Sequence, residues 1–438
     1  MFTPKKMTNT WHLDILPSEV LLLIFDFCDE YDLLRLSEVC KRFYEIVRTD
    51  VAWFKKSKRF LVTNQTSERF RERCNTILRP STSWFVSNNW RYGIYKKETI
   101  FTHKLKVISW LRMTNDILWW CGGHNFYGLK RKEKSTIYFT REKKYKLIGG
   151  DIIKFVLWKD FIICGHIDGT LNYLKVNFDK NKYHVAKVFL NNKLERPFMN
   201  SVNAVDATSE IVIVGLQCGG IKILRHPDMD KSEKHIYQND DYDNRICKRL
   251  KNRVQSLSID PTGVRFAVGS SGFTETPLHV IDIERYTVAD TMNYLWRYGA
   301  GILDMLWDDP NTLITCGYDT RIRKWDVRTG NCVCAWTDPT DATLFSISSD
   351  HRYSMITGTQ YNCLAVLWDQ RKSDFVQMYY VNSTGSSQCS PIYSVQFDST
   401  NMYCATDRHV FKLNFSVNSY QRLDYKSVFS SSCRLMHN

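Results

Sequence analysis

Between residues 13 and 60, apolar positions recur every three to four residues, which predicts short amphipathic helices. The first helix carries the widest apolar stripe, formed by Leu16, Val20, Ile24 and Cys28, with Leu21 and Phe25 in the neighbouring row. Pro17 suits the first helical position, where its missing N–H is not needed, and Glu19 places negative charge in the first turn. A second helix is expected after an N-cap at Asp32, and a third after Asp50.

These three helices carry more apolar surface than they can bury among themselves. The apolar positions of the second are Leu33, Leu36, Val39, Cys40, Phe43 and Val47, and those of the third are Val51, Trp53 and Phe54. A unit of about 45 residues buries too small a fraction of its surface to be more than marginally stable alone. Part of the apolar surface should therefore face either another protein or the rest of this chain. The helical period does not choose between these two interpretations.

From about residue 105 the helical period gives way to short β-type runs separated by turns. One plan recurs: an apolar run, a turn, a second run that ends in a small residue and Gly, another turn, and a third run. Copies occupy residues 106–131, 151–176, 201–224, 253–284, 301–330, 343–371 and 391–415. The last six begin 42 to 52 residues apart, which is the spacing of four-stranded propeller blades. We therefore predict a mainly β protein with a seven-bladed β-propeller, although the spacing alone is also compatible with six or eight blades.

The ring must close, but the last copy shows only three strands and ends near Phe415. The missing outer strand is expected from GIYKKETIFT, residues 93–102, because pairing the two ends of the ring covers open strand edges. The predicted organisation is a flexible N-terminus over 1–12, the helices over 13–60, a helical or irregular linker over 61–92, the propeller over 93–416 and a loose tail over 417–438. The charged segment 228–252 is expected to be a surface loop between two blades.

The helical region resembles an F-box. The resemblance rests on the order Leu16-Pro17-x-Glu19-Val20-Leu21-Leu22-x-Ile24-Phe25, then Asp32-Leu33-Leu34, Val39-Cys40-Lys41-x-Phe43, and Asp50 followed by Phe54-Lys55. It implies that the helices dock on the Skp-type adaptor of a cullin–RING ubiquitin ligase. The residues that it assigns to adaptor binding, shared between the helical core and the adaptor groove, are Leu16, Pro17, Glu19, Val20, Leu21, Ile24, Phe25, Leu33, Leu34, Leu36, Val39, Cys40, Lys41 and Phe43.

The repeats resemble WD repeats, since two copies contain Trp325-Asp326 and Trp368-Asp369. Thr315, Asp319 and Trp325 occupy the positions where the family links a strand hydroxyl, a turn carboxylate and an indole N–H, but the Gly-His pair that usually opens a repeat is missing. SNNWRYG, 87–93, and LITCGYDTRIRKWDVRTG, 313–330, resemble one member of the F-box/WD-repeat family in particular. The combination implies a substrate-recognition subunit of a Skp–cullin–F-box ubiquitin ligase, which directs a protein substrate to ubiquitination and proteasomal degradation.

Substrate is expected on one face of the propeller, around the central channel. The aligned residues that open the innermost strands are Lys154, Asn203, Gln255, Leu303, Phe345 and Tyr393, and those at the turns between second and third strands are Ile167, Gln217, Tyr318 and Gln360. Because this set has one Lys and no Arg, it predicts a neutral pocket whose aromatic rings anchor a substrate that need not be phosphorylated. The alternative is that these rings only plug the mouth of the channel. Arg321 and Arg323 are expected on an outer strand instead.

Composition fits a packed protein without catalytic chemistry. Hydrophobic residues make up 43% of the 438 residues, and no apolar run reaches the length of a membrane span. The start of the chain lacks the features of a secretion signal, and the 14 cysteines lack zinc-ligand spacing, so we expect reduced, buried thiols in the cytoplasm or nucleus. There is no G-x-S-x-G, Walker-type or H-E-x-x-H motif. We therefore expect no enzyme, no cofactor and no metal.

The charge leaves two other hypotheses open. The net charge is +14, and residues 101–150 carry eleven Lys or Arg against three Asp or Glu. This could indicate a propeller that binds RNA or acidic partners. The basic runs lack interleaved aromatic residues, however, which favours a solvated rim of lysines, and nucleic acid is not an expected partner. The remaining alternative is a scaffold whose F-box holds the adaptor without entering a ligase.

Overall fold

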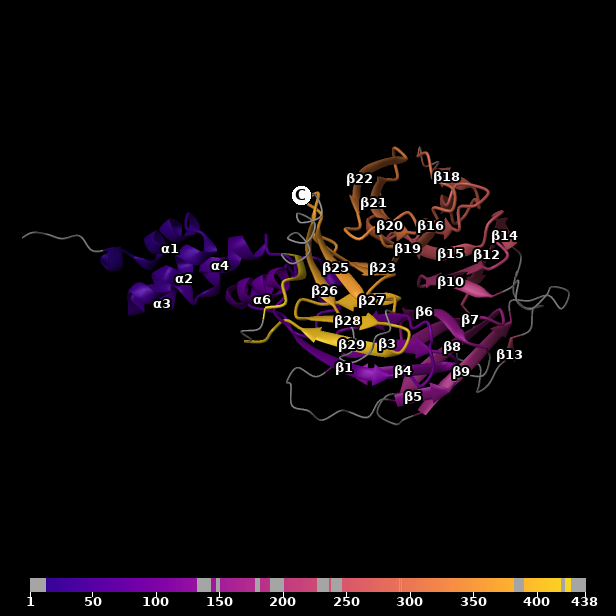
Figure 1. The fold of residues 1–438 in the computed structure, drawn as a ribbon, viewed down its shortest axis with the longest axis horizontal. Helices are drawn as coiled ribbons and strands as arrows, with labels where there is room; N and C mark the ends of the chain where they lie inside the picture. The colour runs from indigo at the N-terminus through magenta and orange to yellow at the C-terminus, as the bar shows by residue number, and fades with distance from the viewer. Residues whose placement is uncertain are drawn as a thin grey trace, which may run out of the picture.

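The chain forms a helical arm that projects from a ring of β-sheets in the computed structural model (Figure 1). The structure describes residues 13–131, 143–146, 150–177, 182–189, 201–226, 236–237, 246–290, 292, 294–381, 390–418 and 422–426. The expected N-terminal segment 1–12 lies outside these residues. Within the described part of the chain, no helix is both long and apolar enough to cross a membrane.

The arm starts with a 3₁₀ turn, Leu13–Ile15, and continues with α1 (Ser18–Asp26), α2 (Glu30–Val39), α3 (Lys41–Val47) and α4 (Asp50–Ser57). The expected second helix is thus two helices, and its predicted start was wrong. Asp29, not Asp32, is the N-cap, because its Oδ1 accepts a hydrogen bond of 2.7 Å from the Asp32 amide. The break falls at Cys40, whose extended backbone turns α3 back onto α2.

Seven four-stranded antiparallel sheets form the ring, as predicted from the repeats. The first three blades are β2 (Leu111–Met113), β3 (Ile117–Gly122), β4 (Asn125–Lys130) and β5 (Lys143–Lys146); β6 (Ile152–Trp158), β7 (Phe161–His166), β8 (Thr170–Asn177) and β9 (Lys182–Phe189); and β10 (Val202–Ala207), β11 (Ile211–Leu216), β12 (Gly220–Arg225) and β14 (Ile246–Arg249). The next three are β15 (Val254–Ile259), β16 (Arg265–Ser270), β17 (Leu278–Asp282) and β18 (Val288–Asp290); β19 (Ile302–Asp309), β20 (Thr312–Gly317), β21 (Arg321–Asp326) and β22 (Asn331–Thr337); and β23 (Leu344–Ser349), β24 (Ser354–Thr359), β25 (Leu364–Asp369) and β26 (Phe375–Tyr380). A two-residue strand, β13 (Ile236–Tyr237), runs parallel to β9.

The seventh blade closes the ring with strands from both ends of the propeller. It contains β27 (Ser394–Phe397), β28 (Asn401–Ala405) and β29 (His409–Asn414), and its outer strand is β1 (Lys96–Thr102). β1 pairs with β29 in antiparallel register, with Lys96 opposite Asn414 and Thr102 opposite His409. The predicted origin of the missing strand is therefore confirmed. This pairing covers an edge of β1 and an edge of β29 that would otherwise lack hydrogen-bond partners.

The glycine that ends the second run of several repeats has a packing role. Gly165 ends β7 beside Val202 of the next blade, and a Cβ at Gly165 would collide with that valine side chain. Gly215 has the same relation to Val254 one blade further on. A residue without a side chain at this point lets the innermost strand of the following blade approach closely. The glycine that recurs in the repeats is therefore explained by close packing between neighbouring blades.

In the two repeats that contain Trp-Asp, the indole N–H groups donate to threonine hydroxyls as expected, but the Asp319 carboxylate is not part of this hydrogen-bond set. The Nε1 of Trp325 donates to Thr315 Oγ1 at 2.9 Å, and that of Trp368 donates to Thr357 Oγ1 at 3.0 Å. Asp319 instead forms an ion pair with Arg323. Arg321 and Arg323 lie on β21, the third strand of their blade, where Arg323 also donates to the Tyr294 hydroxyl at 2.8 Å. The expected outer position of these two arginines is consistent with this arrangement.

We expect a Thr315→Val variant to lose about 1–3 kcal/mol of unfolding free energy, because valine keeps the shape of the side chain but leaves the buried Trp325 N–H without its acceptor. Thermal or urea denaturation followed by circular dichroism would measure the change. Thr329→Val, at an exposed turn of the same blade, is the matched control and should be nearly neutral. Equal stability of T315V and T329V would contradict a structural role for the indole bond.

Two segments predicted to be loose contain ordered structure. Ile246–Arg249, from the expected loop 228–252, is the outer strand β14 of the third blade. Residues 422–426 of the expected tail dock on the propeller, where the Leu423 amide donates to Gly93 O at 2.9 Å and the Lys426 amide to Gln377 Oε1 at 3.0 Å. The remainder of both segments, apart from β13 and residues 250–252 and 417–418, lies outside the described residues. These residues are ordered because they bond to residues that are distant in the sequence, and local composition does not predict such contacts.

Candidate adaptor and substrate surfaces

The four helices of the arm share a small core that takes up part of the predicted adaptor-binding set. Phe25 and Phe43 meet edge to face with ring centroids 5.5 Å apart, and Leu21 and Leu33 are buried beside them. These four side chains are at most 5% exposed, so they form the part of the predicted set that belongs to the helical core. The period of an apolar stripe marks a face that is buried within the chain at least as strongly as a face for a partner.

The other predicted residues lie at or near the surface of the arm. Pro17, Glu19, Val20, Ile24, Leu34, Val39 and Lys41 are exposed, and Leu16, Leu36 and Cys40 are partly buried. Their role in binding an adaptor stays a prediction. The exposed members include four large apolar side chains, which is more than scattered surface hydrophobics account for in so short a segment.

Sequence reasoning missed several exposed apolar residues of the arm. Leu23 on α1 is 62% exposed, and Phe27, the C-cap residue of α1, is 93% exposed. Leu13, Ile15 and Tyr31 are exposed as well. Leu23 and Phe27 are four residues apart, so a second apolar row on α1 was the signal that could have found them. With the exposed residues above, they form the apolar face of the arm.

A guanidinium group holds the start of this apolar face in place. Arg42 of α3 donates through Nη2 to Leu16 O at 2.5 Å and through Nη1 to Asp14 O. The 3₁₀ turn carries Leu13 and Ile15 and is thereby tied to α3, although it has no buried residue of its own. At the other end of α1, Lys56 donates to Cys28 O at 2.6 Å. Cationic donors satisfy backbone carbonyls that the ends of short helices leave without partners.

A single helix, α6 (Pro80–Tyr92), contacts both the arm and the propeller. Near its start, Trp84 packs against Trp53 of α4 with ring centroids 6.1 Å apart, and it meets Tyr31 edge to face. At its end, Trp90 stacks on Phe415 with ring centroids 3.5 Å apart. Figure 1 shows α6 between the four helices of the arm and the blade that contains β26.

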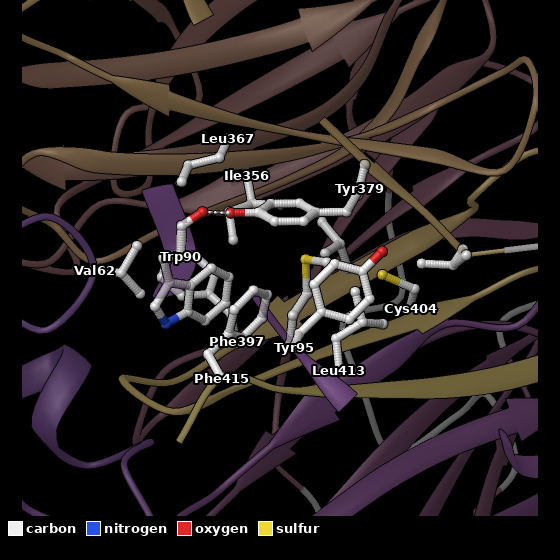
Figure 2. Close-up of a cluster of buried hydrophobic side chains, with 14 of the residues drawn as sticks. Val62, Trp90, Tyr95, Ile356, Leu367, Tyr379, Phe397, Cys404, Leu413 and Phe415 are labelled. Atoms are coloured by element: carbon white, nitrogen blue, oxygen red, sulfur yellow. Dashed lines mark hydrogen bonds between the residues drawn. The ribbon is translucent and has the colours of Figure 1, made fainter. Parts of the chain in front are cut away.

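Residues of the predicted helical or irregular linker, 61–92, are part of the protein core. Figure 2 shows Val62 and Trp90 among side chains from the last two blades, including Ile356, Tyr379 and Phe415. The Val62 amide donates to Ser354 Oγ at 2.7 Å, and the Tyr379 hydroxyl donates to Trp90 O at 2.6 Å. These contacts fix the direction in which the arm leaves the ring.

The structure brings several of the predicted rim residues together, and Lys154 is bonded to two of them. Lys154 is half-buried, and its Nζ sits 4.3 Å from the Trp110 ring centroid and donates to Gln255 O and Leu303 O at 3.4 Å. Burial lowers the pKa of Lys154, with the Asp304 carboxylate acting in the opposite direction. Lys154 therefore ties neighbouring inner strands together, and its role in substrate binding stays a prediction.

At the channel mouth, the rest of the predicted set is half-buried or exposed. Phe345 and Tyr393 meet edge to face with ring centroids 5.4 Å apart, and Tyr318 is exposed. Among the polar members, Asn203 Nδ2 donates to Gln217 Oε1 at 2.6 Å. Gln255 and Gln360 are partly buried, and the apolar Ile167 is exposed. Both interpretations of the aromatic rings, anchors or plug, are compatible with this arrangement.

Three exposed apolar residues near Tyr318 were missed. Leu295 and Tyr298 are 94% and 82% exposed in the segment before β19, and Phe273, in the turn after β16, meets Tyr298 edge to face at 5.4 Å. Tyr318 donates its amide hydrogen to Gly301 O at 2.9 Å, which places this segment beside the predicted rim. The signal was the unusual density of aromatic residues in NYLWRYG, which the repeat pattern treated only as a connection.

The described cysteines are free thiols, and half of them are buried. Burial raises the pKa of Cys121 to about 12 and raises those of Cys164 and Cys316 well above the usual thiol range. Such thiols are poor nucleophiles. In the part of the chain that the structure describes, no group of three or more His, Cys, Asp or Glu side chains is arranged to hold a metal ion.

The chain combines an arm of short helices that has exposed apolar side chains with a seven-bladed ring that has WD-type indole bonds, which is the combination expected of an F-box protein with a WD-repeat propeller. Comparison with known proteins agrees, since residues 13–59 match the F-box-like family. The chain is 26% identical over 406 residues to human F-box/WD repeat-containing protein 4, covering 91% of this chain and 92% of the relative. The mouse protein of the same name is 25% identical over 407 residues, with the same coverage. The resemblance to the F-box/WD-repeat family is confirmed.

Proposed function

We propose that this protein is the substrate-recognition subunit of a Skp–cullin–F-box ubiquitin ligase, working in the cytoplasm or nucleus. The observation that carries the proposal is the apolar face of the arm, which stays exposed although α6 packs the arm firmly onto the propeller. An apolar face of this extent on a small helical unit indicates a partner protein. The similarity to F-box/WD repeat-containing proteins supports a Skp-type adaptor as that partner.

In this proposal the two ends of the protein divide the work. The arm binds the adaptor and, through it, the cullin–RING core, while the loops of the propeller bind a protein substrate. Ubiquitin transfer is then accelerated by proximity, because a substrate lysine is held at high local concentration beside the ubiquitin-charged enzyme. A joint that fixes the arm relative to the ring is useful for this purpose, since it limits the region that the substrate can explore.

We expect a Phe27→Asp variant to lose the adaptor. Phe27 is almost fully exposed, so aspartate should not disturb folding, but a carboxylate buried in an apolar interface without a partner is costly. An interface hot spot is worth about 2 kcal/mol or more, which corresponds to a roughly 30-fold rise in Kd. Affinity purification of tagged full-length protein from cells, with quantification of adaptor and cullin, measures the effect.

Val264→Asp is the matched control, because Val264 is an exposed apolar residue on the propeller. The V264D protein should recover adaptor and cullin as the parent does. Recovery of adaptor without cullin would favour the scaffold hypothesis over the ligase. Recovery of neither by the parent protein would contradict the proposal. Proteins that accumulate on F27D but not on the parent are candidate substrates, because they bind the propeller and escape degradation.

A further inference from the structure

A cavity of about 400 Å³ lies at the end of the central channel where the innermost strands finish, away from the predicted substrate rim. Its walls include the last residues of β2, β15 and β23, together with Asp304–Trp307 of β19. The segment around α5 (Glu68–Arg71), between the arm and α6, crosses this end of the ring and contributes Arg69 and Arg73. Arg112 of β2 completes a set of three arginines around the cavity.

None of these arginines forms an ion pair within 4.0 Å with a described carboxylate, although Asp308 near Arg69 and Asp350 near Arg73 partly oppose the lowering of the arginine pKa values by burial. Arg69 donates to Trp307 O at 3.0 Å and to Asp308 O, so its contacts are with backbone carbonyls. Arg73 donates to Ser348 Oγ at 3.1 Å and to Ser349 O. The guanidinium of Arg112 lies 5.3 Å from the Trp110 ring centroid and has no hydrogen bond to a described residue. The ion pairs within 4.0 Å in the described chain involve other residues.

The one carboxylate on the cavity wall is already engaged. Asp304 accepts hydrogen bonds of 3.0 Å from the amides of Met305 and Ile347. Burial raises its pKa, and Lys154, deeper in the channel, is the largest opposing influence. Asp304 therefore interacts with both Lys154 and Arg112, and the lining of the cavity has three arginines against this one carboxylate.

The wall also contains buried polar atoms without hydrogen bonds. Arg73 Nε makes none, and His351 Nδ1, which makes none either, lies 3.7 Å from Asp308 Oδ1. Burial lowers the pKa of Arg73 to about 10 and that of His351 to about 3, with the charge of Arg73 contributing to the latter. His351 is therefore neutral near pH 7 and Arg73 remains a cation. The Asp350 and Asp398 carboxylates offset part of the cost of burying this cation, and an anionic ligand in the cavity would offset more.

We propose that this cavity binds a small anion that carries phosphate, held by the guanidinium groups of Arg69, Arg73 and Arg112. Guanidinium groups match phosphate oxygens with paired hydrogen bonds, and Arg73 uses only two of its five N–H donors on Ser348 and Ser349. The volume falls in the range of small-molecule sites, about 300–1,000 Å³. Because Arg69 and Arg73 belong to the segment that leads from the arm into the ring, the ligand would also fasten that segment to the blades.

The test is calorimetric titration of the full-length protein with inorganic phosphate and, separately, with pyrophosphate, at constant ionic strength set with chloride. We expect saturable binding to the parent protein. We expect the affinity of an Arg112→Gln variant to be at least 10-fold lower. Arg112 is the residue to replace because it makes no hydrogen bond that the fold depends on. Tighter binding of pyrophosphate would assign a ligand with more than one phosphate group, and equal binding would assign a single phosphate.

Arg285→Gln, on an exposed outer turn of the fourth blade, is the matched control and should bind like the parent. Equal losses in R112Q and R285Q would overturn the proposal, because they would show attraction to the overall positive charge. Absence of binding by both phosphates would overturn it as well. Binding of a phosphoserine hexapeptide but not of pyrophosphate would also count against it, since the site would then recognise a phosphorylated peptide and not a small anion.

Discussion

Replacing Trp90 with alanine will lower the free energy of unfolding by about 3–5 kcal/mol, the range for removing a large aromatic side chain from a core. The indole is fully buried, stacks on Phe415 at 3.5 Å, and meets Tyr379 and Phe397 edge to face. Its Nε1 donates to Ser399 O at 3.0 Å. No neighbour from the arm can fill the space, because Trp84 lies at the other end of α6 against Trp53.

Urea denaturation followed by circular dichroism measures this change. Trp90→Phe should retain more stability than Trp90→Ala, since it keeps a ring against Phe415 and loses the bond to Ser399. Trp296→Ala is a control on the propeller, where the indole is only half-buried, and its cost should be smaller. A midpoint for W90A equal to that of the parent would show that α6 does not hold the arm to the ring.

An Arg131→Met variant will lose a similar amount, about 3–5 kcal/mol, for an electrostatic reason. Arg131 forms an ion pair with Asp398, and the two side chains are 2% and 0% exposed. The same guanidinium donates through Nη1 to Arg73 O at 2.7 Å and to Thr114 O at 2.5 Å. Methionine matches the length of the side chain but leaves a carboxylate buried without its counter-ion.

The double variant Arg131→Met with Asp398→Asn separates the ion pair from packing. Its loss should be clearly smaller than the sum of the two single losses, because no buried charge remains unpaired. Arg328→Met is the control, since the pair of Arg328 with Asp326 lies at the surface, where solvent screens the charges, and its loss should change the unfolding free energy far less. Strict additivity of the two single variants would contradict the ion-pair explanation.

Arg131 also shows where sequence reasoning about charge stopped. It belongs to KRKEK, a run interpreted as part of a solvated basic rim, yet its side chain is buried. The partner that decides this, Asp398, is 267 residues further along the chain. Residues 132–134 of that run and 141–142 of REKKYK lie outside the described residues. The charge of a segment gives no information on which of its members a distant blade will pair with.

The repeats, in contrast, could be predicted because each blade is made from neighbouring residues. The spacing of the copies, their terminal glycines such as Gly165 and the strand from residues 96–102 all reflect local pairing or ring closure. The joint could not be predicted in the same way, because Val62 and Trp90 are buried by residues from the last two blades. The cavity beneath the ring depends on the same long-range packing, which places α5 under the channel.

For the arm, the sequence pattern did not separate the buried face of α1 from its exposed face. Leu21 and Phe25 are buried, whereas Val20 and Ile24 of the same predicted stripe are exposed, as are Leu23 and Phe27 outside it. An apolar stripe and a partner-binding surface have the same period, so only the positions of the other helices separate them. The rim aromatics Tyr318, Phe345 and Tyr393 remain candidates, with Leu295 and Tyr298 added beside them.

Hydrogen–deuterium exchange of the full-length protein, alone and with purified Skp-type adaptor, tests the central claim most directly. If the arm presents a free apolar face from a fixed joint, adaptor will slow exchange within residues 13–57 and leave the blades from β10 to β18 unchanged, while α6 will exchange slowly in both samples. Unchanged exchange over 13–57 with adaptor in excess would contradict the account, because the exposed face of α1 would then have no affinity for the partner that we propose.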